Sequence, residues 1–203
     1  MRVSREKAAE NRERIVETAA RLFRENGFDG VGVDAIMKEA GLTHGGFYGH
    51  FASKDDLAAE AVTLALQQGT EWLSRSSDLD DFVAEYLSER HRADLANGCA
   101  LAALSADMVR QGEGVRRGLT ANLRAQLDRF ADLFRDGAAA RRRKRAIATL
   151  AGLVGALTLA RAVDDRALSR EILAAARDEF GKMRPTDRIG DRRERRTASV
   201  RDS

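Results

Sequence analysis

The stretch Thr43-His-Gly-Gly-Phe-Tyr-Gly-His-Phe-Ala-Ser-Lys-Asp-Asp-Leu57 carries the strongest signal for the fold of this chain. It follows a short amphipathic segment that ends in Ala40-Gly41-Leu42, and this order predicts a helix, a tight glycine turn and a second helix. A helix enters the major groove of DNA only when its first turn is slim and phosphate contacts hold it in register. The pattern therefore indicates a helix-turn-helix segment that contacts double-stranded DNA.

Working outward, the preceding residues predict two helices that support this segment. Residues 5–26 form one apolar stripe at helical spacing, with Ile15, Ala19, Leu22 and Phe23 as its members. Gly27 is expected to stop this helix, and Gly41 to stop a shorter one that starts near residue 33. Thr43 is the expected N-cap of the third helix, which runs to about His50. Phe47 and Phe51 are expected to point back into the three-helix core.

The remaining chain also reads as helical, so the predicted fold class is all-α. Ser53 is expected to cap a longer helix that ends near Ser74. Further helices are expected over residues 76–87, 99–108, 115–134, 141–164 and 168–182. The only proline, Pro185, lies beyond all of them, and no repeat of 20–50 residues is present.

The charge distribution separates the body of the chain from its end. The net charge is +3, but residues 182–203 hold eight Lys/Arg and four Asp/Glu, a surplus of four. Residues 1–181 therefore carry a net charge of −1. Because the body lacks a broad positive field, any contact with DNA must come from individually placed residues. Residues 184–203, short of apolar side chains, are predicted to be a disordered basic tail.

Cysteine usage and hydropathy point to a cytoplasmic protein without membrane contact. The single cysteine, Cys99, excludes an intramolecular disulfide and a thiolate zinc cluster. Residues 1–14 are highly charged and lack the apolar core of a signal peptide. The longest apolar run, residues 146–160, is shorter than the roughly 20 residues that cross a bilayer.

The glycines of the quoted stretch have two explanations. Gly45 and Gly46 each cost about 1 kcal/mol in helix propensity relative to alanine, which suits a loose turn without any partner. It equally suits a backbone that must approach a surface closely. Neighbouring side chains favour the second explanation, because the Tyr48 hydroxyl can donate to one phosphate and the Lys54 ammonium to another.

Three linked motifs resemble those of a known family. They are Leu22-Phe-Arg-Glu-Asn-Gly-Phe28, Ile36-Met-Lys-Glu-Ala-Gly41 and Tyr48-Gly-His-Phe-Ala-Ser-Lys-Asp-Asp-Leu57. With these motifs at this spacing, residues 10–57 resemble the DNA-binding domain of TetR-family transcriptional regulators. About a quarter of the chain is covered.

The resemblance implies roles for individual residues. It places Thr43, His44, Gly45 and Gly46 against the bases, and it assigns Tyr48, His50 and Lys54 to gripping the phosphate backbone or bracing the helix. Two departures stand out. Gly32-Val33 replaces the usual Thr-Val or Ser-Val, which removes a capping hydroxyl, and Gly49 adds a third glycine to the recognition helix.

The resemblance also implies the organisation of the whole chain. Residues 1–53 would form the DNA-binding head, residues 54–183 a helical effector-binding and dimerisation domain, and residues 184–203 the tail. The expected protein is a homodimer that represses transcription from a palindromic operator and is released by an unidentified small-molecule effector. Two segments, residues 97–104 and 155–165, resemble one subgroup whose effectors are often electrophiles or small aromatics. Open alternatives are an activator, and a small-molecule-binding or thiol-based sensor protein whose head is vestigial.

Small residues recur every four positions along the penultimate predicted helix, at Ala148, Gly152, Ala156 and Ala160. Such a ridge lets two helix backbones approach closely. Since the family's dimer packs its last two helices against those of the partner, the ridge is assigned to the dimer interface. An intramolecular helix contact is the alternative.

The candidates for lining an effector cavity are mainly aromatic: Trp72, Tyr86, Cys99, Met108, Phe130 and Phe134. Core packing alone also explains such residues at helical spacing. Cys99 follows Gly98 at an expected helix N-terminus, where a thiolate is stabilised. It is either a small buried residue or the thiol of a redox or electrophile sensor.

A dense basic run, Arg141-Arg-Arg-Lys-Arg145, opens the penultimate helix, where cations oppose the helix dipole. It is either a solvated helix start or a second phosphate contact.

Enzyme motifs are missing from the sequence. There are three histidines and no Glu-x-x-His pair, which leaves a di-iron site unsupported. Gly112-Glu-Gly-Val-Arg-Arg-Gly118 is one residue too long for a dinucleotide fingerprint. No enzymatic activity, cofactor or metal is predicted.

Overall fold

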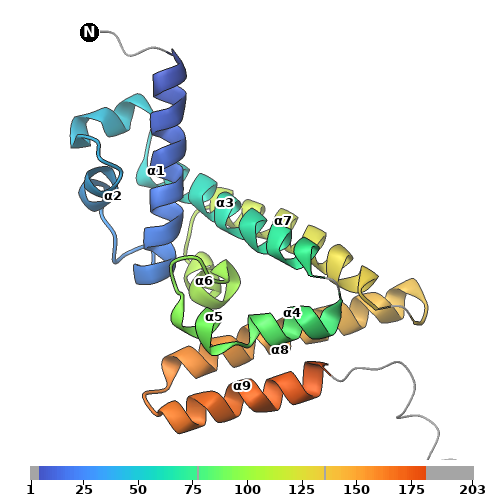
Figure 1. Cartoon of the computed structure of the whole chain (residues 1–203). Coiled ribbons are helices and arrows are strands. Elements are labelled where there is room, and N and C mark those ends of the chain that lie inside the picture. The colour runs from blue at the N-terminus through green and yellow to red at the C-terminus, as the bar shows by residue number, and fades with distance from the viewer. Residues whose placement is uncertain (1–4, 77, 135, 182–203) are drawn as a thin grey trace, which may run out of the picture.

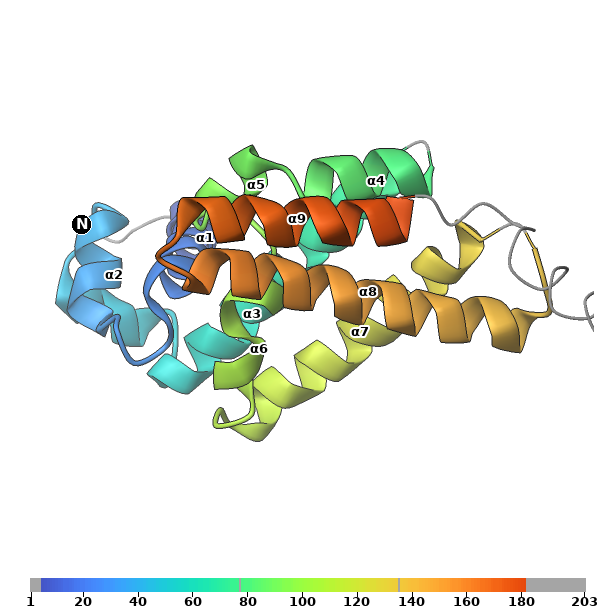
Figure 2. The ribbon, with the colours of Figure 1, turned by 90° about the horizontal axis from the view of Figure 1, so that it is seen from below.

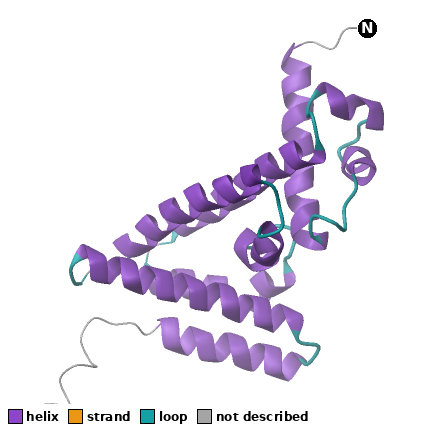
Figure 3. Ribbon diagram, turned by 180° about the vertical axis from the view of Figure 1, so that it is seen from behind, coloured by secondary structure: helices purple, strands orange, loops and turns teal. Residues whose placement is uncertain are grey.

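The computed structural model describes residues 5–76, 78–134 and 136–181, and all regular structure in these ranges is helical (Figure 3). The elements are α1 (Arg5–Asn26), α2 (Val33–Glu39), the 3-10 helix η1 (His44–Gly49), α3 (Lys54–Arg75), α4 (Leu79–Tyr86), α5 (Glu89–Ala93), α6 (Ala100–Met108), α7 (Glu113–Asp132), α8 (Ala139–Ala162) and α9 (Arg166–Gly181). The predicted all-α class is confirmed. The predicted tail, residues 184–203, lies outside the described residues.

The head consists of α1, α2 and η1, which stand together at one end of the molecule (Figure 1). Gly27 and Gly41 end α1 and α2 with φ angles of 74° and 70°, a left-handed conformation that glycine adopts without steric cost. Phe23, Ile36 and Phe47 are fully buried between the three elements. The predicted glycine stops and the inward orientation of Phe47 and Phe51 are therefore confirmed.

The recognition element differs from the prediction, because it is a 3-10 helix rather than an α-helix. Three of its six residues are glycines, which hold a regular α-helix poorly. The tighter pattern is visible in the bond from the Gly46 amide to the Thr43 carbonyl, 3.0 Å. Thr43 does stand at the N-cap, but its side chain makes no capping hydrogen bond.

Helix α3 connects the head to the rest of the chain. Ser53 caps it as predicted, since its hydroxyl accepts a hydrogen bond from the Asp56 amide, 3.1 Å. Its first half packs on α1, and it lies along α7 for most of its length (Figure 1). Arg12 of α1 forms an ion pair with Glu60 of α3 and lies over the Phe51 ring, with the guanidinium carbon 4.6 Å from the ring centroid. The predicted boundary after residue 53 stays a prediction, because α3 packs on both parts.

The other helices enclose the second core. α7 packs on α8, α4 packs on α9, and α6 contacts α1, α3 and α8. Helices α8 and α9 run side by side along one face of the molecule (Figure 2). The short helix α5 is an addition to the predicted elements, and Ser88 caps it by accepting from the His91 amide, 3.1 Å.

The small-residue ridge of α8 makes a close contact with α9. A methyl group at Gly152 would lie only 2.1 Å from the Phe180 ring of α9. Ala156 and Ala160 are buried within the chain, and the Ala160 carbonyl accepts from the Ser169 hydroxyl, 2.6 Å. Only Ala148 is exposed. Gly152, Ala156 and Ala160 therefore take part in the intramolecular contact that was the alternative, and their assignment to a dimer interface stays a prediction.

The basic run at the start of α8 is held by the corner between α7 and α8. Arg143 pairs with Asp128 of α7, the Arg145 guanidinium carbon lies 4.3 Å from the centroid of the Phe134 ring, and Arg142 donates to the Gly137 carbonyl, 3.1 Å. This corner lies at the opposite end of the molecule from η1 (Figure 1). These contacts explain the cations by local pairing, and the position disfavours a phosphate contact shared with the head.

Helix α8 is the one described helix that is long and apolar enough to span a bilayer by length and composition. Core helices of soluble proteins meet the same criterion, and α8 packs on both α7 and α9. Its composition is therefore weak evidence for a membrane span.

Candidate DNA-binding surface and effector cavity

The recognition element presents its predicted contact residues to solvent. Thr43, His44 and Gly45 are exposed, and the Tyr48 side chain is 69% exposed although it is aromatic. Phe47 anchors the element from behind, with its ring edge-on to Tyr48 at a centroid distance of 5.3 Å. The buried Phe47 ring thus supports the Tyr48 side chain, which itself stays exposed to solvent.

The glycines of η1 are not required by the packing of the head. None has a positive φ angle. A methyl group at Gly45 or Gly49 would meet nothing within 4 Å, and one at Gly46 would make only ordinary contact with Met37, at 3.7 Å. Because the chain itself has room for side chains there, the missing bulk favours the close approach of something outside it.

Two predicted contact residues already have partners in the head. His44 contacts the Asp34 carboxylate at the start of α2 through Nδ1, an ion pair when the imidazole is protonated. His50 is half-buried and forms the C-cap of η1. His44 is therefore positioned by α2, while His50 lies where it can brace the element.

Lys54 is also engaged, which its sequence position did not reveal. Its ammonium donates to the Phe28 carbonyl at 2.6 Å, and this bond joins the start of α3 to the turn after α1. The side chain is half-buried. An ammonium has three donors, so a phosphate contact beside this bond stays a prediction.

The second site is a cavity of about 90 Å³ within the C-terminal helices. Its lining comes from α3, α4, α6, α7, α8 and the loop before α6: Gln68, Gly69, Trp72, Leu73, Phe82, Tyr86, Asn97, Gly98, Cys99, Leu101, Gln126, Phe130 and Leu150. Of the predicted effector residues, Trp72, Tyr86, Cys99 and Phe130 lie together in this wall. Met108 and Phe134 are buried in the core and do not line the cavity.

The aromatic side chains of the wall form one cluster. Trp72 stacks on Tyr86, with centroids 5.7 Å apart and planes at 15°. Phe82 lies beside both rings, and Phe130 meets Phe82 edge-on at 5.2 Å. The Trp72 indole N–H donates to the Glu85 carboxylate, 2.9 Å, which fixes the indole.

Two buried polar atoms of the wall lack hydrogen-bond partners. They are the hydroxyl of Tyr86, a residue 2% exposed, and Oε1 of Gln126, a residue 7% exposed. Burial raises the pKa of Tyr86 well above its usual range, and the Cys99 thiol adds to this shift because it lies near the hydroxyl, although the two groups do not meet the geometry of a hydrogen bond. Unsatisfied buried polar atoms are rare in folded proteins, so their presence in one cavity wall marks it as a candidate binding site.

Cys99 is the N-cap of α6, and His91 holds it there. The Cys99 amide donates to His91 Nε2, 3.0 Å, and His91 Nδ1 lies 2.6 Å from the Tyr86 carbonyl. The imidazole therefore carries its proton on Nδ1 and accepts at Nε2. Burial is the main cause that lowers the pKa of His91, which favours this neutral form. Cys99 is only partly buried, so its thiol belongs to the cavity rather than to the close-packed core.

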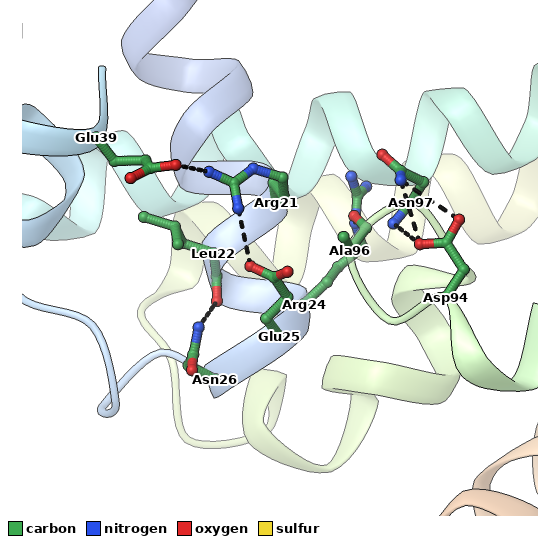
Figure 4. A network of polar contacts seen from close by, with 9 residues as sticks. All are labelled: Arg21, Leu22, Arg24, Glu25, Asn26, Glu39, Asp94, Ala96 and Asn97. Atoms are coloured by element: carbon green, nitrogen blue, oxygen red, sulfur yellow. Dashed lines mark hydrogen bonds and ion pairs between the residues drawn. The ribbon is translucent and has the colours of Figure 1, made fainter. Parts of the chain in front are cut away.

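Arg24 connects the head to the cavity wall. This residue of α1 is 5% exposed; its Nε donates to the Ala96 carbonyl at 2.6 Å, and its Nη1 donates to Gln68 Oε1 at 3.0 Å. Figure 4 shows Arg24 reaching from α1 toward the loop of Asp94, Ala96 and Asn97. Gln68 and Asn97 both line the cavity. Sequence reasoning missed Gln68, Asn97 and Gln126, since a polar residue on a helix or in a turn gives no sign that it faces a cavity.

Helix α2 of the head is also linked to α1 by an ion pair. Arg21 of α1 donates to Glu39 of α2 at 2.6 Å and to Glu25 of its own helix at 3.1 Å (Figure 4). A displacement of α1 would therefore carry α2 with it.

The head has the geometry of a known class. A short helix, a glycine turn and an exposed second element, mounted on a long first helix, define a helix-turn-helix DNA-binding protein. The family model described as bacterial regulatory proteins, tetR family, matches residues 15–61. HTH-type transcriptional regulator AcrR of Shigella flexneri is 39% identical over 64 residues, which cover 32% of this chain and 30% of that protein. The matched stretch thus spans less than a third of the relative's length.

Solved structures share the fold over most of the chain. Reduced E. coli NemR superposes with a TM-score of 0.68 and 21% identity, covering 89% of this chain and all of that chain. A TetR transcriptional regulator from Chloroflexus aurantiacus gives a TM-score of 0.68 at 25% identity, covering 87% and 94%. The head over residues 15–61 is therefore a TetR-family DNA-binding domain, and the described helices as a whole have the fold of TetR-family regulators.

Substituting Tyr48 of η1 and Lys54 at the start of α3 tests the DNA-binding surface. We expect Tyr48→Phe and Lys54→Met each to weaken binding to every DNA duplex alike, because phosphate contacts carry no sequence information. For Lys54→Met, the slope of log affinity against log salt concentration should fall by about one unit. Fluorescence anisotropy with labelled duplexes at several salt concentrations measures both effects.

Lys54→Met also removes the bond to the Phe28 carbonyl, so its melting temperature must be recorded. A loss of affinity with an unchanged salt slope would assign Lys54 to bracing the head only. Unchanged affinity in Tyr48→Phe would remove its hydroxyl from the contact set.

Proposed function

We propose that this chain is a ligand-responsive repressor that binds a palindromic operator as a homodimer and is released by a small-molecule effector. The observation that carries the proposal is Arg24, which joins the first helix of the head to the wall of an aromatic cavity. One buried side chain thus contacts both the part that would read DNA and the part that would bind the effector. Its expected place of action is the cytoplasm.

The release mechanism follows from this connection. An effector that contacts Gln68 or the loop of residues 94–99 changes the positions of the two groups that accept from Arg24. Helix α1 would follow, and the spacing of the two heads in the dimer would no longer fit successive major grooves, about 34 Å apart. The effector needs only to bind the DNA-free arrangement more tightly than the DNA-bound one.

A gel shift with the DNA upstream of the protein's own gene tests DNA binding, and a reporter assay with the same promoter tests repression. We expect a sequence-specific shift and a lower reporter signal when the protein is expressed. A raised signal would mean an activator. A protein that fails to shift this DNA or a library of random duplexes would favour a binding protein with a vestigial head.

The outer face of α8 and α9 supports the homodimer. Large apolar side chains are exposed on these two helices, Ile147 at 48% and Leu159 at 58% on α8 and Leu168 at 42% on α9. Both helices lie on the same side of the molecule (Figure 2). A second copy placed there would bury apolar surface that the single chain leaves in water, and two helices from each copy would form a four-helix bundle.

Single charges on this face test the dimer. We expect Leu159→Glu to shift the protein to a monomer in analytical ultracentrifugation, because the carboxylate would be buried in the apolar interface. Val109→Glu is the matched control, since Val109 is 72% exposed and lies outside α8 and α9. A Leu159→Glu protein that stays dimeric would move the interface elsewhere.

A thiol-based electrophile sensor is the second candidate function, favoured by the position of Cys99 in the cavity wall beside Tyr86. In this version the effector is an electrophile that becomes attached to the sulfur.

N-ethylmaleimide is a direct probe of this version, because Cys99 is the only cysteine of the chain. We expect the reagent to label the protein once and to release it from DNA. The Cys99→Ser protein should stay bound to DNA under the same treatment. If Cys99→Ser releases DNA as readily as the unaltered protein, the sensor function is excluded.

A further inference from the structure

We propose that the cavity binds a neutral, single-ring aromatic molecule that carries a hydroxyl group, with phenol as the simplest member of the class. This inference rests on the proposed function, since it names the kind of effector that the cavity would take.

The walls define the shape of the ligand. Trp72, Phe82 and Tyr86 have centroids 5.4 to 5.7 Å from one another, and Phe130 closes the cluster edge-on. Rings prefer such stacked and edge-to-face arrangements, so another ring is the most favourable addition. An engineered cavity of about 150 Å³ holds one benzene molecule. The cavity here, at about 90 Å³, is smaller, so a single ring fits only when the wall moves outward, and fused rings do not fit.

The two unpartnered atoms define the polar group. Gln126 Oε1 only accepts hydrogen bonds, whereas the Tyr86 hydroxyl both donates and accepts. Neighbouring atoms cover both groups, so the wall must shift slightly to expose them to a ligand. A ligand hydroxyl that reaches both would donate to Gln126 Oε1 and accept from Tyr86, and one group would satisfy both atoms. A ligand that only accepts, such as an ether or a ketone, leaves Gln126 Oε1 unsatisfied. A hydrocarbon leaves both atoms unsatisfied.

The charges around the cavity favour a neutral molecule. The described lining contains no carboxylate, ammonium or guanidinium group. Arg24 donates to Ala96 and Gln68, and Arg161 donates to the backbone carbonyls of His91, Arg92 and Asp94 at 2.7 to 3.2 Å. Nη1 of Arg161 has no partner, but Arg161 does not line the cavity, so a carboxylate there would lose its hydration without direct contact to this cation.

The chain supplies its own reporter for the experiment. Trp72 is the only tryptophan and stacks on Tyr86 in the wall. Its fluorescence, excited at the red edge of tryptophan absorption, is followed while the full-length protein is titrated with phenol, toluene or benzoate. We expect phenol to bind with a Kd on the order of 1 mM, as its seven heavy atoms allow. Toluene and benzoate should bind more weakly.

Variants separate the polar contacts from the apolar ones. Tyr86→Phe should weaken phenol binding about five- to tenfold and leave toluene binding unchanged or stronger. Gln126→Leu should act in the same direction. Gln67→Leu is the matched control for Gln126→Leu, because Gln67 is exposed on α3 and does not line the cavity. Melting temperatures confirm that each variant is folded, and Tyr86→Phe should not melt lower, since it removes an unpaired hydroxyl.

Three results would overturn the inference: no response of Trp72 to phenol, tighter binding of benzoate than of phenol, or equal phenol affinities for Tyr86→Phe and the unaltered protein. Benzoate is included because its carboxylate could pair with Nη1 of Arg161, which is buried without a partner near Cys99. The gel shift described above is run on the same samples. A protein that binds its DNA but not phenol contradicts only the ligand class, whereas one that binds phenol but no DNA contradicts only the proposed function.

Discussion

The buried guanidinium of Arg24 is the interaction on which the arrangement of head and core depends. Burial of a cation is costly, and it lowers the pKa of Arg24, with Asp94 partly opposing the shift. The cost is offset only while the Ala96 carbonyl and the Gln68 side chain both accept from it. Hydrogen bonds to a charged group contribute about 2 kcal/mol each. If the head or the loop of residues 94–99 moved alone, the Arg24 guanidinium would stay buried without its hydrogen-bond partners. Movement of the head together with the loop is therefore favoured.

The same loop is held from the opposite side. Arg161 of α8 donates to carbonyls of residues 91, 92 and 94, and a methyl group at Gly98 would lie 2.4 Å from the Asp94 carbonyl oxygen. Two arginines from distant parts of the sequence thus hold one turn by its backbone oxygens. Ligand contacts in that turn affect both α1 and α8, the first helix of the head and a helix of the outer face.

The helices of this chain could be predicted from the sequence because local signals agree with the final packing. Glycines with left-handed φ angles end α1 and α2, the Ser53 hydroxyl caps α3, and apolar spacing identifies the buried faces. The geometry of η1 could not be predicted, since a glycine-rich hexapeptide has little preference between α and 3-10 pairing. The helix that the small residues of α8 contact could not be predicted from the sequence either. Small residues indicate a close helix contact but do not identify its partner, which is Phe180 of the same chain.

The individual residues that line the cavity could also be predicted only in part. Aromatic residues at helical spacing predict a buried cluster, and Trp72, Tyr86 and Phe130 do meet there. Met108 and Phe134 fit the same pattern, yet they lie in close-packed core. The difference arises from how α4, α6 and α7 cross, which depends on contacts distant in the sequence. The bond from Lys54 to the Phe28 carbonyl is hidden for the same reason.

Gly152 has a consequence for the shape of the outer face. With hydrogen in place of a side chain, it lets the Phe180 ring rest on the α8 backbone, and this contact sets the tilt of α9 against α8. Even an alanine there would make the Phe180 ring turn away or push α9 from α8, and either change alters the layer that the two helices form. A position without a side chain therefore affects the surface on which a second copy would have to fit.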